Sequence, residues 1–150
     1  MRKIFFKLTP HPKNPKMQLP VLEITFQNPN SLDKIFPTIG IIDSGADYCT
    51  IPFKTQKDLG LDLKKIGAQK TGITCACGSK SFFGYLYKLN ILVNDSKGNQ
   101  FTKLIWVEFA ESDTIPLIGR NFMDLFKRIK YDNLKKEGFF IDTRKIEEDD

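Results

Sequence analysis

Short apolar runs, separated by polar segments that contain glycine or proline, recur along the whole chain. Residues 101–109 are the clearest case, because every second side chain from Phe101 to Phe109 falls on one face of an extended chain. Further strands are predicted over residues 4–8, 21–26, 35–42, 82–93, 115–118, 129–131 and 139–141, and short helices over residues 53–59 and 121–126. Many short strands with two small helices predict a mostly β domain that is closed or sandwich-like.

One compact domain is the expectation for a chain of 150 residues, of which 41% are hydrophobic, enough for a single core. Residues 9–20 contain four prolines, which favour an extended segment. We therefore divide the chain into an N-terminal strand with a proline-rich arm (1–20), a main domain (21–143) and an acidic tail (144–150).

The net charge of +5 raises nucleic acid as a partner, but the lysines are scattered and alternate with acidic residues. No run of basic residues interleaved with aromatic ones is present, so no nucleic-acid partner is predicted. No apolar run approaches the roughly 20 residues that span a bilayer, and the apolar stretch before Lys7 is too short for a signal peptide. The three cysteines, an odd number, do not suggest a disulfide framework. These features predict a cytoplasmic protein without a membrane partner.

Asp43, Ser44 and Gly45 directly follow the apolar run of residues 39–42. A strand that ends in this way places a carboxylate in a tight turn, where glycine permits close approach of the backbone to another group. Such a carboxylate, partly desolvated and beside a second one, can serve as a general acid and base. Asp-Ser-Gly occurs once in the chain, so the second carboxylate has to come from a second copy. Asp95 and Asp113 also precede a hydroxyl residue, but glycine does not follow directly, and the segment from Asp95 is predicted to be a hairpin turn.

Three segments in this order resemble the retropepsin-like aspartic proteases: Ile41-Ile42-Asp43-Ser44-Gly45-Ala46-Asp47, a hairpin of small residues around Gly72 and Gly78, and Leu117-Ile118-Gly119-Arg120-Asn121-Phe122. The resemblance covers residues 21–142. It implies a closed β-barrel lobe with one or two short helices, and a homodimeric aspartic endopeptidase whose active site lies on the twofold axis. It also implies extended peptide or protein substrates, and neither a cofactor nor a metal.

The resemblance gives each residue of the turn a role. The Asp43 carboxylates of two subunits would activate a water molecule that attacks the scissile carbonyl, with no covalent intermediate. Ser44 would brace the turn across the dimer axis, and Gly45 would present its carbonyl group to the substrate. Ala46 would keep the floor of the cleft small.

Residues 72–83 would form a flap that closes over the substrate. The segment Cys75-Ala76-Cys77-Gly78 departs from the glycine-rich flap tip of the retroviral enzymes. Asp47 and Arg120 match positions that form a partly buried ion pair near the dimer contact. Substrate contacts are implied for Ala46, Asp47, Gly72, Ile73, Ala76, Gly78, Leu117 and Ile118, and support of the turn or the dimer for Gly119, Arg120 and Asn121.

Other hypotheses stay open. The unusual flap leaves room for a retropepsin-fold module that dimerises or binds peptides with little or no turnover. A basic nucleic-acid-associated protein would require binding that weakens steeply with salt. A zinc site of Cys49, Cys75 and Cys77 with His11 is conceivable, but the spacing is not that of a zinc knuckle, and Cys49 fits the core better. Trp106 is expected in the core or the cleft wall.

Overall fold

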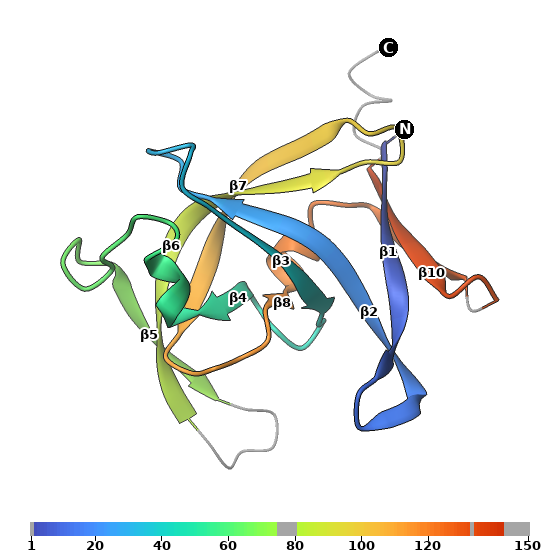
Figure 1. Ribbon diagram of the computed structural model, residues 1–150, viewed down its shortest axis with the longest axis horizontal. Helices are drawn as coiled ribbons and strands as arrows, with labels where there is room; N and C mark the ends of the chain where they lie inside the picture. The colour runs from blue at the N-terminus through green and yellow to red at the C-terminus, as the bar shows by residue number, and fades with distance from the viewer. Residues whose placement is uncertain (1, 75–80, 133, 143–150) are drawn as a thin grey trace.

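The computed structural model describes residues 2–74, 81–132 and 134–142. Strands make up most of this part of the chain, which confirms the mostly β class (Figure 1). The strands are β1 (Arg2–His11), β2 (Asn14–Gln27), β3 (Ile35–Ile42), β4 (Cys49–Pro52), β5 (Gln69–Thr74), β6 (Ser81–Asn94), β7 (Gln100–Ala110), β8 (Leu117–Ile118), β9 (Arg128–Asp132) and β10 (Glu137–Asp142). A 3-10 helix (Phe53–Gln56) follows β4, and a short helix, α1 (Arg120–Met123), follows β8.

The strands of the described residues form one sheet in the order β5-β6-β7-β4-β8-β3-β2-β1-β10-β9. An additional antiparallel pairing joins β2 to β6, with Thr25 opposite Leu92 and Gln27 opposite Asn90. Because of this pairing, the strands β2, β3, β8, β4, β7 and β6 close into a ring. Strand β5 extends the sheet beyond β6, and β1, β10 and β9 extend it beyond β2.

The proline-rich segment belongs to a long hairpin rather than to a connection without a partner strand. Strands β1 and β2 pair antiparallel, with Thr9 opposite Leu19 and Pro10 opposite Gln18. Residue 20, where the predicted arm ends, therefore lies inside β2. Proline is compatible with a strand wherever its missing N–H is not needed by the neighbouring strand, and the sequence pattern alone does not reveal which positions these are.

Strand β7 shows the alternation that its sequence predicts. Ile105, Val107 and Phe109 are buried, whereas Trp106 between them is 44% exposed. The expectation that Trp106 lies in the core or the cleft wall is therefore wrong, because its side chain lies on the exposed face of the strand and does not line the cleft over Asp43. There the ammonium group of Lys88 lies 5.0 Å from the centre of the Trp106 ring.

Four phenylalanines join the end strands of the sheet to the segment around α1. Phe140 of β10 has its ring centre 5.2 Å from that of Phe6, 5.3 Å from that of Phe122 and 5.1 Å from that of Phe126. Tilted and edge-to-face rings at these distances add to the stabilisation from burial alone. The cluster thus fixes β1 and β10 to the segment that follows β8.

Both predicted helices are shorter than expected. The 3-10 helix ends at Gln56, and α1 spans Arg120–Met123 instead of residues 121–126. The predicted hairpin around residue 70 is present, because β5 and β6 pair antiparallel from Gln69 opposite Leu86 to Thr74 opposite Ser81. Its tip, residues 75–80, lies outside the described residues.

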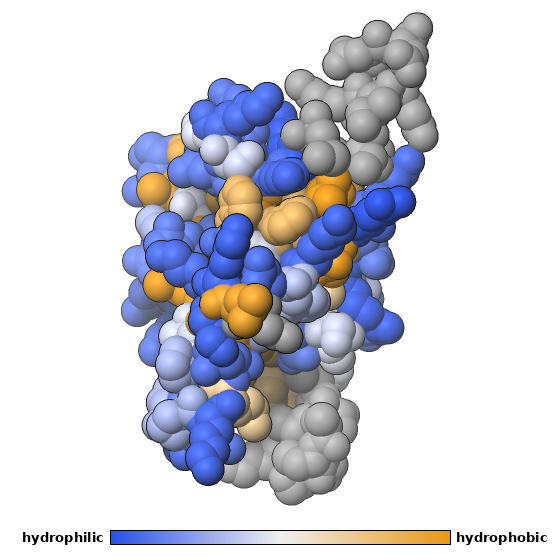
Figure 2. Space-filling view, turned by 90° about the vertical axis from the view of Figure 1, so that its right-hand side faces the viewer, coloured by the Kyte–Doolittle hydropathy of each residue, from blue (hydrophilic) through white to orange (hydrophobic). Residues whose placement is uncertain are grey.

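Polar residues cover most of the side that carries β1 and β10, and apolar residues show between them as separate patches (Figure 2). Among the exposed apolar residues of the molecule are Phe5 of β1, at 44%, and Tyr131 of β9, at 55%. Within residues 2–74, 81–132 and 134–142, helices are too short and too polar to cross a membrane.

Candidate active site

The Asp43 turn starts where β3 ends beside β8 (Figure 1). The two strands run parallel, with Ile41 opposite Leu117 and Ile42 opposite Ile118. The Asp43 N–H continues this pairing and donates to the carbonyl of Ile118 at 2.9 Å. The backbone of Asp43 is therefore fixed by a ladder between two segments that are far apart in the sequence.

The Asp43 carboxylate is oriented by its own turn. The N–H of Gly45 donates to Oδ1 at 2.8 Å, and the N–H of Ala46 donates to the main-chain carbonyl of Asp43 at 3.2 Å. The other carboxylate oxygen, Oδ2, has no hydrogen-bond donor among the described residues, and the Asp43 side chain is only partly buried. Ser44 is exposed, and its hydroxyl has no hydrogen-bond partner in the described part of the chain.

Helix α1 supports this turn through its first amide groups. The N–H of Arg120 donates to the carbonyl of Ala46 at 2.8 Å, and that of Asn121 donates to the carbonyl of Asp47 at 3.2 Å. Gly119 packs directly against the same loop. The turn and the start of α1 therefore form one hydrogen-bonded unit.

The side chain of Asn121 connects this unit to two strands. Its Oδ1 accepts a hydrogen bond from the Cys49 N–H at 2.9 Å, and its Nδ2 donates to the carbonyl of Trp106 at 2.6 Å. Asn121 thus satisfies a backbone donor of β4 and a backbone acceptor of β7, which accounts for an amide at this position.

Asp47 and Arg120 form the ion pair that the resemblance implies, with the guanidinium Nη2 donating to Oδ1 of the carboxylate. Both side chains are exposed in the single chain, at 57% for Arg120 and 68% for Asp47. The expectation of a partly buried pair therefore does not hold within one chain. An exposed pair contributes only about 0–1 kcal/mol to stability.

A cleft of about 580 Å³ lies over the Asp43 turn. The turn forms one side of it, and the paired strands β5 and β6 contribute another. Its lining consists of Asp43, Gly45, Ala46, Asp47, Tyr48, Thr50, Gln69, Thr71, Gly72, Phe82, Leu86, Glu108, Thr114 and Leu117.

Some of the residues predicted to contact substrate line this cleft. These are Ala46, Asp47, Gly72 and Leu117. Ile118 is fully buried, so it supports the cleft from behind. Ile73 lies in β5, whereas Ala76 and Gly78 lie outside the described residues. The role of all these residues in substrate binding stays a prediction.

Glu108 is a residue of the cleft that sequence reasoning missed. It lies in β7 between the buried Val107 and Phe109, so alternation alone could have placed it on the opposite face. Its Oε2 accepts a hydrogen bond from the Thr71 hydroxyl at 2.8 Å. Burial raises the pKa of Glu108 above its ordinary value, and the Thr71 hydrogen bond opposes this only in part.

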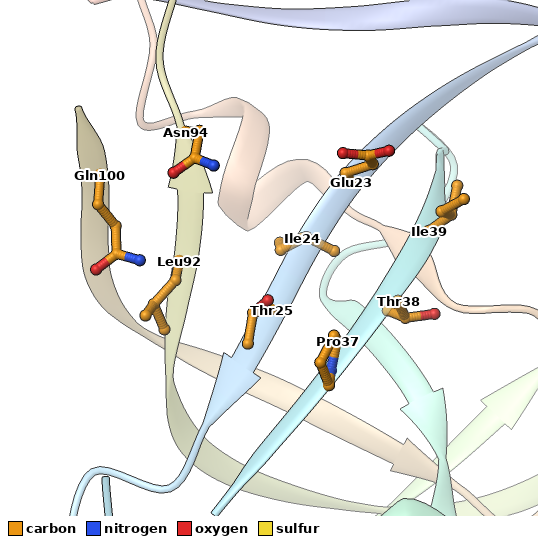
Figure 3. A pocket seen from close by; sticks show the side chains of 9 residues that line it. All are labelled: Glu23, Ile24, Thr25, Pro37, Thr38, Ile39, Leu92, Asn94 and Gln100. Atoms are coloured by element: carbon orange, nitrogen blue, oxygen red, sulfur yellow. The ribbon is translucent and has the colours of Figure 1, made fainter. Parts of the chain in front are cut away.

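A second hollow, of about 390 Å³, lies where β2 and β6 separate (Figure 3). Their pairing ends at Thr25 opposite Leu92, and Figure 3 shows Glu23 on one diverging strand and Asn94 on the other. Glu23 is the one charged residue of its lining. This hollow therefore has a single carboxylate, whereas Asp43, Asp47 and Glu108 all line the cleft over the turn.

Cys49 is fully buried, as predicted. Burial raises the pKa of its thiol to about 12, against the smaller effect of hydrogen bonds from the backbone of Gly119 and Phe122. The thiol therefore stays protonated at neutral pH and is no nucleophile. The zinc alternative also requires Cys75 and Cys77, which lie outside the described residues.

The ring of strands, with an Asp-Ser-Gly turn beside a short parallel strand, is a retropepsin-like fold. The crystal structure of a retropepsin-like aspartic protease from Rickettsia conorii is similar to this chain with a TM-score of 0.59 and 18% sequence identity, covering 92% of this chain and 98% of that one. The EIAV protease complexed with an inhibitor is similar with a TM-score of 0.40 and 17% identity, covering 71% of this chain and 86% of that one. No protein-family model and no curated protein matches the sequence.

Proposed function

We propose that this chain is a homodimeric aspartic endopeptidase, which hydrolyses peptide bonds with a water molecule activated between two Asp43 carboxylates, one from each subunit. The observation that carries the proposal is the Asp43 carboxylate itself. It is held at 2.8 Å by the Gly45 N–H on the side of an open cleft of about 580 Å³. The retropepsin-like fold is shared with the Rickettsia conorii protease, but it is the site and not the fold that carries the argument for the chemistry.

The mechanism follows from placing two such carboxylates face to face. Two carboxyl groups at hydrogen-bond distance share one proton, because the repulsion between two negative charges at so short a distance prevents both groups from ionising. The ionised carboxylate accepts a proton from the water, whose oxygen attacks the scissile carbonyl carbon. The protonated carboxylate donates a hydrogen bond to the carbonyl oxygen as negative charge develops there. Collapse of the tetrahedral intermediate, with a proton passed to the leaving nitrogen, releases an amine and a carboxylic acid.

The surroundings of the turn support a second subunit there. Ser44 is exposed and has no side-chain partner among the described residues, although it lies next to Asp43. The Asp47–Arg120 ion pair is exposed on the same loop. These polar groups are available for contacts across a twofold axis, where the resemblance places them.

The direct test is cleavage of a diverse mixture of unfolded peptides between pH 3 and 8, measured over a range of protein concentrations. A site shared by two subunits predicts that activity per chain rises with concentration until the dimer is saturated. Activity per chain that stays constant down to concentrations at which sedimentation shows monomers would contradict the shared site. A folded dimer that binds peptides without cleaving any would favour the peptide-binding module.

Arg120→Ala is expected to weaken the dimer by about tenfold in dissociation constant while changing the stability of the monomer by less than about 1 kcal/mol. The pair is exposed in one chain, so its loss costs the monomer little. In the dimer, an unpaired Asp47 would be desolvated at the contact. Sedimentation equilibrium and denaturant unfolding separate the two effects.

Lys54→Ala is the matched control for this variant, because Lys54 forms an exposed ion pair with Asp113 at 3.3 Å and neither residue lines the cleft. Lys54→Ala is expected to leave the dissociation constant of the dimer unchanged. Equal dissociation constants for wild type and Arg120→Ala would show that the Asp47–Arg120 pair has no part in the dimer.

A further inference from the structure

Five cross-strand neighbours form a row along the cleft. Gln69 of β5 is opposite Leu86 of β6, which in turn is opposite Glu108 of β7. Glu108 is also opposite Thr50 of β4, and Thr50 is opposite Leu117 of β8. All of them line the cleft, and Glu108, in the middle of the row, is its one charged member.

Glu108 forms no ion pair in the described part of the chain, where the Thr71 hydroxyl at 2.8 Å is its hydrogen-bond partner. Lys88, which lies two residues from Leu86 on the same side of β6, has its ammonium group 5.0 Å from the centre of the Trp106 ring instead. The other titratable side chains that line the cleft are Asp43, Asp47 and Tyr48, and none of them carries positive charge. The cleft is therefore acidic although the chain as a whole has a net charge of +5. A half-buried carboxylate without a cation loses hydration that a single hydroxyl donor replaces only in part.

We infer that Glu108 determines substrate specificity by binding a lysine or arginine side chain of the peptide that occupies this cleft. The inference rests on the proposed function, because it takes the cleft to be the substrate site. A cation on the substrate would form a charge-assisted hydrogen bond with the carboxylate, which is about twice as strong as a neutral one. An acidic side chain at the same place is disfavoured by like charge.

The preference for a lysine or arginine side chain is expected to depend on pH. Because burial raises the pKa of Glu108, this carboxyl loses its proton at higher pH than an exposed glutamic acid does. At acidic pH Glu108 is neutral, and the preference for a basic side chain disappears. The preference grows as pH rises through the pKa of Glu108. Comparison of the lysine-to-glutamine ratio of kcat/KM values in wild type and in Glu108→Gln at each pH isolates the part of the preference that depends on Glu108.

The experiment begins with a positional-scanning peptide library, which shows where lysine or arginine is favoured. Values of kcat/KM are then compared for two peptides that differ only by lysine or glutamine at that position. Wild type is expected to prefer the lysine peptide by roughly tenfold or more, and Glu108→Gln to treat both peptides nearly alike. Glutamine keeps an acceptor for the Thr71 hydroxyl, and thermal unfolding checks that the variant is folded.

Glu111→Gln provides the matched control, because Glu111 follows the same strand, pairs with Lys64 at 3.6 Å and does not line the cleft. It should keep the full preference. A library without a basic preference at any position, or a preference that Glu108→Gln retains, would overturn the inference while cleavage itself upholds the proposed function.

Binding of the same two peptides separates the inference from the proposed function. Fluorescence anisotropy is measured with Asp43→Asn and with the double variant Asp43→Asn, Glu108→Gln. If wild type cleaves nothing, the proposed function fails and the two peptides are chosen by binding of the same library to Asp43→Asn. A lysine preference in binding that depends on Glu108 would then still support the inference. Equal binding of both peptides, or binding of neither, would overturn it.

Discussion

Asp43→Asn is expected to lower kcat/KM for peptide cleavage on the order of a thousandfold or more and to leave the protein folded. Asparagine keeps the side-chain oxygen that accepts the Gly45 N–H at 2.8 Å, so the turn is preserved. The amide does not accept a proton from water, so the nucleophile is no longer activated. The measurement is the cleavage of a peptide chosen from the mixture, together with thermal unfolding of the variant.

Asp58→Asn is the matched control for this variant, because Asp58 is an exposed carboxylate that does not line the cleft. It makes the same chemical change and is expected to keep wild-type activity. Wild-type activity in Asp43→Asn would exclude the proposed mechanism, whatever the fold.

Mixing wild-type and Asp43→Asn subunits tests whether two copies of the residue share one site. If both carboxylates of a dimer are needed, activity falls with the square of the wild-type fraction, so an equal mixture retains about a quarter of the activity. If each chain carries a complete site, the same mixture retains about half. The subunits are mixed under conditions where the dimer dissociates and reassociates, and the curve distinguishes the two cases.

The sequence was sufficient for the part of the site that is local. An apolar run followed by Asp43, Ser44 and Gly45 has few possible conformations, and the structure has the predicted turn at the end of β3. The strand pattern of residues 101–109 was equally readable, because burial follows directly from alternation there. Whether two Asp43 side chains meet in a dimer stays a prediction.

The non-local part of the site could not be predicted from the sequence, because it depends on the register in which the strands pair. Glu108 meets Thr50 and Leu86 only because β7 pairs with β4 and β6 at particular positions, and a shift of one residue would turn Glu108 to the other face. The same holds for the ion pair, whose exposure in one chain depends on what else packs near Arg120. The prolines misled for a different reason, since a residue such as Pro10 takes an extended conformation with or without a partner strand.

Gly119→Ala is expected to lower the free energy of unfolding by about 3 kcal/mol, at the upper end of the usual cost of overpacking. Backbone conformation is not the reason, because the φ of −87° and ψ of −176° at Gly119 suit any residue. Space is the reason, since a Cβ would lie 2.3 Å from the carbonyl oxygen of Tyr48 and 2.9 Å from that of Ala46. Both are main-chain atoms, so the loop itself has to move.

Alanine substitutions at two other glycines provide a comparison for this loss of stability. A Cβ on Gly72 meets nothing within 4 Å, so Gly72→Ala is expected to change stability by less than about 0.5 kcal/mol. A Cβ on Gly40 would lie 2.6 Å from Cδ1 and 2.8 Å from Cγ1 of the buried Ile118, and side-chain atoms shift at lower cost than the main-chain atoms beside Gly119, so Gly40→Ala is expected to fall between the other two. Denaturant unfolding of the three variants gives their free energies of unfolding. Equal values for Gly119→Ala and Gly72→Ala would contradict the expected order.

Gly119→Ala should also reduce cleavage by more than the loss of folded protein explains. The carbonyl of Ala46, which the new Cβ would displace, accepts the Arg120 N–H at 2.8 Å and belongs to the turn that orients Asp43. A small shift of that turn changes the separation of two carboxylates that must meet across a twofold axis, and each subunit contributes the same shift. Activity measured at a temperature where the variant is fully folded isolates this effect. Wild-type kcat under those conditions would show that the position of Asp43 does not depend on the packing of Gly119.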